Sequence, residues 1–231
     1  MGSSWVVRHR NAVLLALLLI AYTFQSFAIS APTSGLLSNL VLAVLEFAMV
    51  FIVFERGRER TVVVILLVVS VAIGLSRYIA AFDLGELRAF VFYVLHAIFL
   101  WAAVIVILRD LFRRKRGGAE NVLGAICGYL IAGAGWASLN DVAFWFAPTT
   151  FSINPDLAPL LSDWHGRLVL FLYYSLAQML TIGYSDVTPL RAPATTLSLF
   201  AALFGVCYTA VVVAQFVGLA QPGSGSDRNE A

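Results

Sequence analysis

The chain has 231 residues, of which 61% are hydrophobic and 12% are charged, and its mean hydropathy is +0.89. Because an ordinary soluble domain is about half apolar and about a quarter charged, this composition excludes a soluble globular protein and indicates a protein within a lipid bilayer. The formal net charge of +2 is too small to suggest a nucleic-acid partner.

Six apolar stretches are long enough to cross about 30 Å of hydrocarbon as helices. They are Asn11–Ala31, Leu36–Phe54, Thr61–Phe82, Ala89–Leu108, Val122–Phe146 and Ala194–Leu219. A different kind of segment separates the fifth from the sixth. It begins with a loop containing three prolines and continues with a shorter apolar run, Gly166–Leu180. At about 15 residues this run is too short to span the membrane comfortably, and it predicts a re-entrant helix.

The basic residues between these stretches predict their orientation, since loops rich in Lys and Arg stay on the cytoplasmic side. Three groups lie before the first stretch, between the second and third, and between the fourth and fifth: Arg8 and Arg10; Arg56, Arg58 and Arg60; Arg109, Arg113, Arg114, Lys115 and Arg116. The opposite connections carry little positive charge. With six crossings, both termini are expected in the cytoplasm, and the re-entrant segment is expected to enter from outside.

The hexapeptide TIGYSD, residues 181–186, directly follows the re-entrant run. It is polar and contains a glycine, so it does not extend the apolar helix. Non-helical backbone at membrane depth is tolerated only where it is buried in protein or lines a water-filled path. We therefore expect this segment to lie beside such a path.

The longer string YYSLAQMLTIGYSDVTP, Tyr173–Pro189, resembles the pore helix and selectivity filter of the tetrameric potassium-channel family. In that family, backbone carbonyl oxygens replace the hydration shell of the permeating ion. One loop cannot surround an ion, so the resemblance implies an assembly of four chains. The C-terminal end of the re-entrant helix would also direct a partial negative charge toward the central cavity.

The resemblance assigns roles to individual residues. The implied ion-binding residues are Thr181, Ile182, Gly183, Tyr184 and Ser185, with the innermost ion site at Thr181. The implied supporting residues are Tyr173, Tyr174, Gln178 and Asp186, where the two tyrosines brace the filter from behind and Asp186 lies just outside it. Gly205 occupies the position of a hinge glycine in the pore-lining helix.

Two residues depart from the family pattern. Gln178 stands where the family commonly has a threonine, which predicts altered hydrogen bonding behind the filter. Ser185 stands where the GYG signature has its second glycine. A non-glycine residue in the left-handed region costs about 1 to 2 kcal/mol, so we expect strain at Ser185 and a distorted outer carbonyl ring. Relaxed selectivity, low conductance or a shut filter would follow, and our hypothesis is that potassium still permeates.

The first four stretches are similar in layout to the voltage-sensing module of six-span channels. A voltage sensor needs several Arg or Lys residues within its fourth helix. The sequence has none between Arg88 and Arg109, so steep voltage gating is not expected. The intramembrane residues Glu46 and His96 are expected at similar depths, where they would form either a fixed polar contact or a proton-sensitive switch. Arg77, about five residues from the outer end of its stretch, could join them or extend to the membrane surface.

The sequence therefore predicts an all-α membrane protein: six transmembrane helices, a re-entrant pore helix and a filter loop between the fifth and sixth, assembled as a homotetrameric pore. We divide it into a four-helix domain (1–118), a pore domain (119–219) and a disordered cytoplasmic tail (220–231). The expected function is passive K⁺ transport across a plasma membrane, and a bacterial inner membrane is favoured by the short loops. No nucleophile with a paired base indicates an enzyme.

The expected partners are other copies of the chain, membrane lipids and monovalent cations. No cofactor is expected besides the permeant K⁺, with Na⁺ as a second permeant ion. Two alternatives remain open because of Ser185. One is a non-selective monovalent cation channel, and the other is a non-conducting subunit that co-assembles with a conventional channel chain.

Overall fold

The computed structural model describes residues 9–28, 34–54, 58–76, 85–113, 119–162 and 164–220, which form a helical bundle with one small sheet. The helices are α2 (Arg10–Ala28), α3 (Ser34–Val53), α4 (Arg58–Leu75), α5 (Gly85–Arg113), α6 (Ala119–Phe146), α7 (Trp164–Met179) and α8 (Ala194–Ala220). Between α6 and α8 lie the 3₁₀ helices η2 (Pro148–Thr150) and η3 (Pro155–Ser162), and the strands β1 (Phe151–Ile153) and β2 (Val187–Pro189).

Each expected apolar stretch overlaps one helix, and α7 overlaps the expected re-entrant run but begins two residues earlier. Within the described residues, three helical segments are long and apolar enough to cross a membrane: Leu87–Arg113, Ala119–Phe146 and Ala194–Val217. Three further apolar segments are shorter: Arg10–Gln25, Leu40–Val53 and Arg60–Leu75. The structure is thus that of a mostly helical membrane protein.

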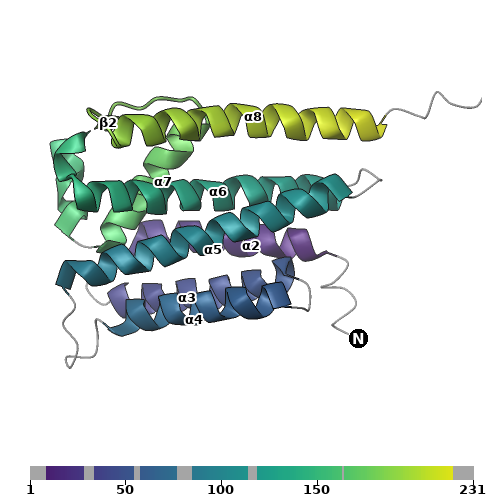
Figure 1. Ribbon diagram of the computed structural model, residues 1–231, viewed down its shortest axis with the longest axis horizontal. Helices are drawn as coiled ribbons and strands as arrows, with labels where there is room; N and C mark the ends of the chain where they lie inside the picture. Colours follow the sequence, from purple (N-terminus) through teal and green to yellow (C-terminus); the bar gives the residue numbers. More distant parts are fainter. Residues whose placement is uncertain are drawn as a thin grey trace, which may run out of the picture.

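Successive long helices run in alternating directions, and the bundle has two distinct ends (Figure 1). α2 begins and α8 ends at the same end, where α5 also ends and α6 begins. Arg10, Arg109 and Arg113 line one cavity at this end, together with Asp110. The segment between α6 and α8, including β2, lies at the opposite end. The structure therefore separates a basic end from the end that carries the candidate filter.

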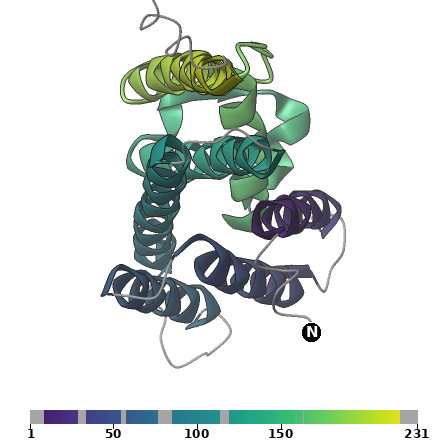
Figure 2. The ribbon, with the colours of Figure 1, turned by 90° about the vertical axis from the view of Figure 1, so that its right-hand side faces the viewer.

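Helix α6 is the centre of the bundle, since it contacts α2, α5, α7 and α8. Viewed along the helices, α8 lies on one side of α6 while α3 and α4 lie on the other (Figure 2). Small residues allow this close packing, which is the usual basis of helix association within membranes. A Cβ atom at Gly133 would lie 2.5 Å from the Leu176 side chain of α7, and one at Gly128 would lie 2.5 Å from the Tyr208 hydroxyl of α8.

The apolar core is continuous between the two expected domains. Its fully buried members include Val50 of α3, Leu67 of α4, Phe99 of α5 and Ile131 of α6. Met179, at the end of α7, belongs to the same cluster. The division at residues 1–118 and 119–219 stays a prediction, and nearly all of the expected tail, 220–231, lies outside the described residues.

Candidate functional site

Buried polar contacts fix α7 against α6. The Arg167 Nε atom lies 3.1 Å from the Asp141 carboxylate, whose side chain is 1% exposed. At the adjacent position of α6, the Asn140 side-chain amide donates a hydrogen bond to the hydroxyl of Ser175, which lies farther along α7, at 3.0 Å. Separating the two partners of a buried ion pair leaves a buried charge uncompensated, which is strongly unfavourable. These contacts therefore hold α7 at a defined depth and rotation. Sequence analysis missed all four residues.

The candidate filter begins where α7 ends at Met179. The Thr181 backbone N–H donates to the Gln178 carbonyl at 2.9 Å, and that of Ile182 donates to the Ala177 carbonyl at 2.9 Å. Thr181 and Gly183 both have left-handed backbone, with φ of 56° and 68°. These two left-handed residues alternate with Ile182 and Tyr184. The chain therefore leaves α7 in a compact segment that is not helical.

The strain expected at Ser185 is not found, and that expectation was wrong. Within the described residues, the non-glycine residue with left-handed φ is Thr181, while Ser185 begins a turn. A left-handed conformation is uncommon for a β-branched residue, so the strain of this segment lies at its inner end. The Ser185 carbonyl oxygen accepts a hydrogen bond from the Thr188 hydroxyl at 3.2 Å.

The outer end of the candidate filter is held by side chains and by the small sheet. The Tyr173 hydroxyl donates to Asp186 Oδ2 at 2.8 Å, and the Tyr173 ring stacks on that of Tyr184 with centroids 5.7 Å apart. The Asn154 backbone N–H donates to the Asp186 carbonyl at 2.8 Å. Beyond this point β2 pairs with β1 in antiparallel register, with Ser152 opposite Thr188.

The two adjacent tyrosines of α7 serve different neighbours. Tyr173 is 38% exposed and reaches the filter residues, whereas Tyr174 is buried. The Tyr174 hydroxyl forms a hydrogen bond with the Ser198 hydroxyl of α8, and its ring lies 6.0 Å from that of Phe151. Tyr174 therefore joins α7 to α8 and to the loop before the filter. Gln178 is half-buried, and its backbone carbonyl accepts the hydrogen bond from the Thr181 backbone N–H.

Gly205 lies where α8 crosses the end of α7. A Cβ atom at this position would lie 2.1 Å from the Met179 carbonyl oxygen, so any side chain would push the two backbones apart. The contact gives Gly205 a packing role beside the filter. A hinge motion at Gly205 stays a prediction.

Residues 181–185 are all exposed in the single chain, with Ile182 at 49% and Tyr184 at 52%. The neighbouring face of α8 is exposed as well, and its large apolar residues include Leu199, Leu203 and Val206. The chain thus exposes an irregular main-chain segment, held by hydrogen bonds at both ends, beside an exposed apolar face of α8. A segment of this kind can supply carbonyl oxygens to an ion, but one chain does not enclose it.

The structure brings Glu46 and His96 together, away from the filter. The His96 Nε2 atom lies 2.7 Å from a Glu46 carboxylate oxygen, and Nδ1 lies 3.1 Å from the Ser138 hydroxyl. Ser138 in turn donates to the Ala134 carbonyl at 3.1 Å. Because the Ser138 hydroxyl donates to Ala134, its oxygen is left to accept a hydrogen bond from His96 Nδ1. Arg77, the third expected member, lies outside the described residues.

No group of three His, Cys, Asp or Glu side chains that could hold a metal ion occurs among the described residues.

Comparison with known proteins bears on the C-terminal part of the chain. A family model described as "Ion channel" matches residues 159–221, a segment that contains α7, the candidate filter, β2 and α8. No curated protein and no solved structure matches the chain. The match supports an ion channel and thereby a protein whose role is transport rather than catalysis.

Proposed function

We propose that this protein is the subunit of a homotetrameric cation channel that passes K⁺ through residues 181–185. The observation that carries the proposal is the geometry of this segment: it emerges from a short buried helix, is held at both ends, and is exposed in one chain. Carbonyl oxygens from several copies would surround a dehydrated cation. The similarity of residues 159–221 to ion channels supports the same function.

The proposed assembly uses the exposed face of α8. Leu199 is 67% exposed and Leu203 is 55% exposed, although both belong to a long apolar helix beside the filter. Closed cyclic symmetry is the usual arrangement of identical subunits. In a four-fold ring, this face would meet a neighbouring chain or the central cavity, and the C-terminal end of α7 would direct its partial negative charge toward the ion path.

The remaining features of the proposal are its membrane topology and gating. We propose six membrane crossings with the basic end in the cytoplasm of a plasma membrane, as the Arg and Lys distribution favours. Between Arg88 and Arg109, α5 contains no Arg or Lys, so current should depend weakly on voltage.

A K⁺ flux assay on purified protein in liposomes tests the function. We expect K⁺ uptake by liposomes that contain the wild-type protein, together with a native mass of four chains. The matched control is Gly183→Ala. A Cβ atom at this position meets no atom within 4 Å, but the left-handed φ of 68° disfavours alanine, so this variant should carry less K⁺ than the wild type. Absence of flux from the wild type in a four-chain assembly would favour the non-conducting subunit.

A non-selective monovalent cation channel is the second candidate. Its support is the hydrogen bond from Thr188 to the Ser185 carbonyl, which occupies the outermost oxygen of the candidate filter. Selectivity in such filters depends on the number of coordinating carbonyl groups. Reversal potentials with K⁺ on one side and Na⁺ on the other distinguish the candidates, since a reversal potential near zero identifies the non-selective channel.

A further inference from the structure

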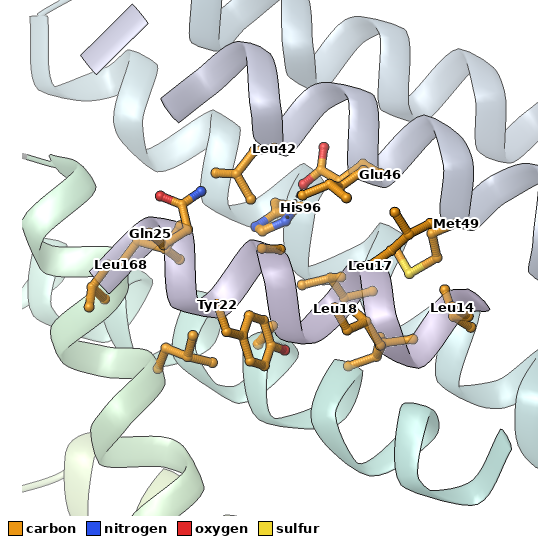
Figure 3. A pocket seen from close by; sticks show the side chains of 17 residues that line it. Leu14, Leu17, Leu18, Tyr22, Gln25, Leu42, Glu46, Met49, His96 and Leu168 are labelled. Carbon is orange, nitrogen blue, oxygen red and sulfur yellow. Dashed lines mark ion pairs between the residues drawn. The ribbon is translucent and has the colours of Figure 1, made fainter. Parts of the chain in front are cut away.

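A cavity of about 60 Å³ lies between α2, α3, α5, α6 and α7, and the filter residues 181–185 are not part of its lining (Figure 3). Residues of α2 at helical spacing form one side of it: Leu14, Leu17, Leu18, Ala21, Tyr22 and Gln25. Leu14 and Gln25 are eleven residues apart, which corresponds to about 16 Å along a helix. The cavity is therefore elongated along α2, with Gln25 at one end and Leu14 at the other.

Gln25 is a polar residue of this cavity that has no hydrogen-bond partner in the part of the chain that the structure describes. Gln25 is 3% exposed, and neither the nitrogen nor the oxygen of its side-chain amide has a hydrogen-bond partner among the described residues. Figure 3 shows the amide directed toward Leu42 of α3, on the same side of α2 as the His96 ring. Leaving both a donor and an acceptor unmatched in apolar surroundings is unfavourable, so the amide points to a bound hydrogen-bonding group.

The other polar groups at the cavity wall are already engaged. Glu46 and His96 form their ion pair at 2.7 Å, and the Tyr22 hydroxyl donates to the Leu130 carbonyl at 2.6 Å. Among the described residues, the lining contains no charged side chain besides that pair. A charged ligand would therefore be buried without a counter-charge, which is unfavourable. The remaining lining is apolar, so it favours a hydrocarbon chain over water.

We propose that this cavity binds an uncharged single-chain amphiphile, with its hydroxyl or carbonyl group on Gln25 and its alkyl chain extending toward Leu14. The volume is several times the roughly 10 to 15 Å³ that one water molecule requires. Leu168, Val169 and Leu172 of α7 form part of the wall, so the bound chain contacts the helix that leads to the candidate filter. The binding itself requires no ion conduction.

Photolabelling of the full-length purified protein with a diazirine derivative of 1-octanol tests the proposal. We expect labelled peptides from the cavity walls on α2, α3 and α7, and we expect 1-octanol to compete about tenfold better than n-octane, which lacks the hydroxyl. In Gln25→Leu, this tenfold preference should disappear. Thr23→Val is the matched control, because Thr23 is an exposed residue of the same helix and its hydroxyl only bonds the Leu19 carbonyl of its own helix.

The melting temperature of Gln25→Leu checks that this variant folds. Gln25→Leu removes an unmatched amide, so the ligand-free variant should melt at a higher temperature than the wild type. Labels confined to lipid-facing residues, equal competition by 1-octanol and n-octane, or a lowered melting temperature in Gln25→Leu would overturn the proposal. Because none of these readouts uses ion flux, failure here is distinguishable from failure of the proposed channel function.

Discussion

The two halves of the bundle use buried polar contacts differently. Around α7, the contact of Asp141 with Arg167 fixes the helix that leads to a non-helical main-chain segment, and the contact of Tyr173 with Asp186 holds the outer end of that segment. Around α2 to α5, the pair of Glu46 and His96 joins regular helices beside an apolar cavity. The comparison indicates that polar contacts in the α7 region determine the shape of the candidate ion path. Those in the other region hold helices together.

The largest effect is expected from Asp141→Asn, which leaves the Arg167 guanidinium without its buried counter-charge. Loss of one partner of a buried ion pair typically costs about 3 to 5 kcal/mol. We expect the free energy of unfolding, measured by denaturant titration in detergent, to fall by about this amount, and K⁺ flux to be lost. The double variant Asp141→Asn with Arg167→Gln should recover part of the stability. Unchanged stability in the single variant would contradict the role given to this pair.

Gly205→Ala tests the contact between α8 and α7. The new methyl group would overlap the Met179 carbonyl, and overpacking of this kind costs about 1 to 3 kcal/mol. We expect a lower melting temperature and reduced K⁺ flux, because the end of α7 has to move. Gly74→Ala is the control, since its Cβ would lie 3.3 Å from the movable Phe92 ring. A Gly205→Ala variant as stable as Gly74→Ala would leave the hinge as the better explanation.

Tyr173→Phe removes the hydrogen bond to Asp186 while keeping the ring stacked on Tyr184. A hydrogen bond of this kind contributes about 1 kcal/mol to stability. We expect a small loss of stability but a clear fall in K⁺ flux, measured in liposomes, because the outer end of the filter loses one restraint. Tyr174→Phe serves as the comparison, since it removes the bond to Ser198 instead. Equal flux in wild type and Tyr173→Phe would show that Asp186 needs no such restraint.

Glu46→Gln tests whether the two halves of the bundle act independently, because it should lower stability without changing K⁺ flux. Glutamine can still accept the His96 hydrogen bond, and an imidazole, unlike the Arg167 guanidinium, can be neutral, so a stability loss of only about 1 kcal/mol is expected. K⁺ flux per assembled channel should remain at the wild-type level. If flux instead falls as it does in Asp141→Asn, the Glu46–His96 pair also governs the ion path, as the proton-switch hypothesis would have it.

The smallest change in stability, a few tenths of a kcal/mol, is expected for Thr188→Val, because Thr188 is exposed and its hydrogen bond to the Ser185 carbonyl is long. Release of that carbonyl should restore one ring of ligands and raise the ratio of K⁺ to Na⁺ permeability severalfold. Reversal potentials under bi-ionic conditions measure this ratio. A ratio unchanged by the substitution would mean that the Ser185 carbonyl does not contribute to selectivity.

Sequence reasoning succeeded where a local pattern or a depth in the membrane was sufficient. Long apolar runs located the helices, because few other structures satisfy the backbone inside a bilayer. The similar depths of Glu46 and His96 indicated a contact, and the structure places their side chains 2.7 Å apart. Counting residues from the ends of two helices gives depth at about 1.5 Å per residue.

The partners of α7 required information that the sequence does not contain. Asn140 and Asp141 lie in an apolar helix that is buried on several sides, so their positions do not reveal which neighbour each one faces. Arg167 would have been a clue, since a basic residue near the start of a buried helix needs a counter-charge. Ser185 was misjudged because its neighbour Asp186 is held by Tyr173 and Asn154, which lie outside the hexapeptide 181–186.

A structure of the assembled protein crystallised with Tl⁺, a heavy substitute for K⁺, tests the central claim most directly. We predict Tl⁺ ions in a row on a four-fold axis, coordinated by the carbonyl oxygens of residues 181–184 from all copies. Residues 181–185 lying far from any symmetry axis, or Tl⁺ absent from their carbonyl oxygens, would contradict it.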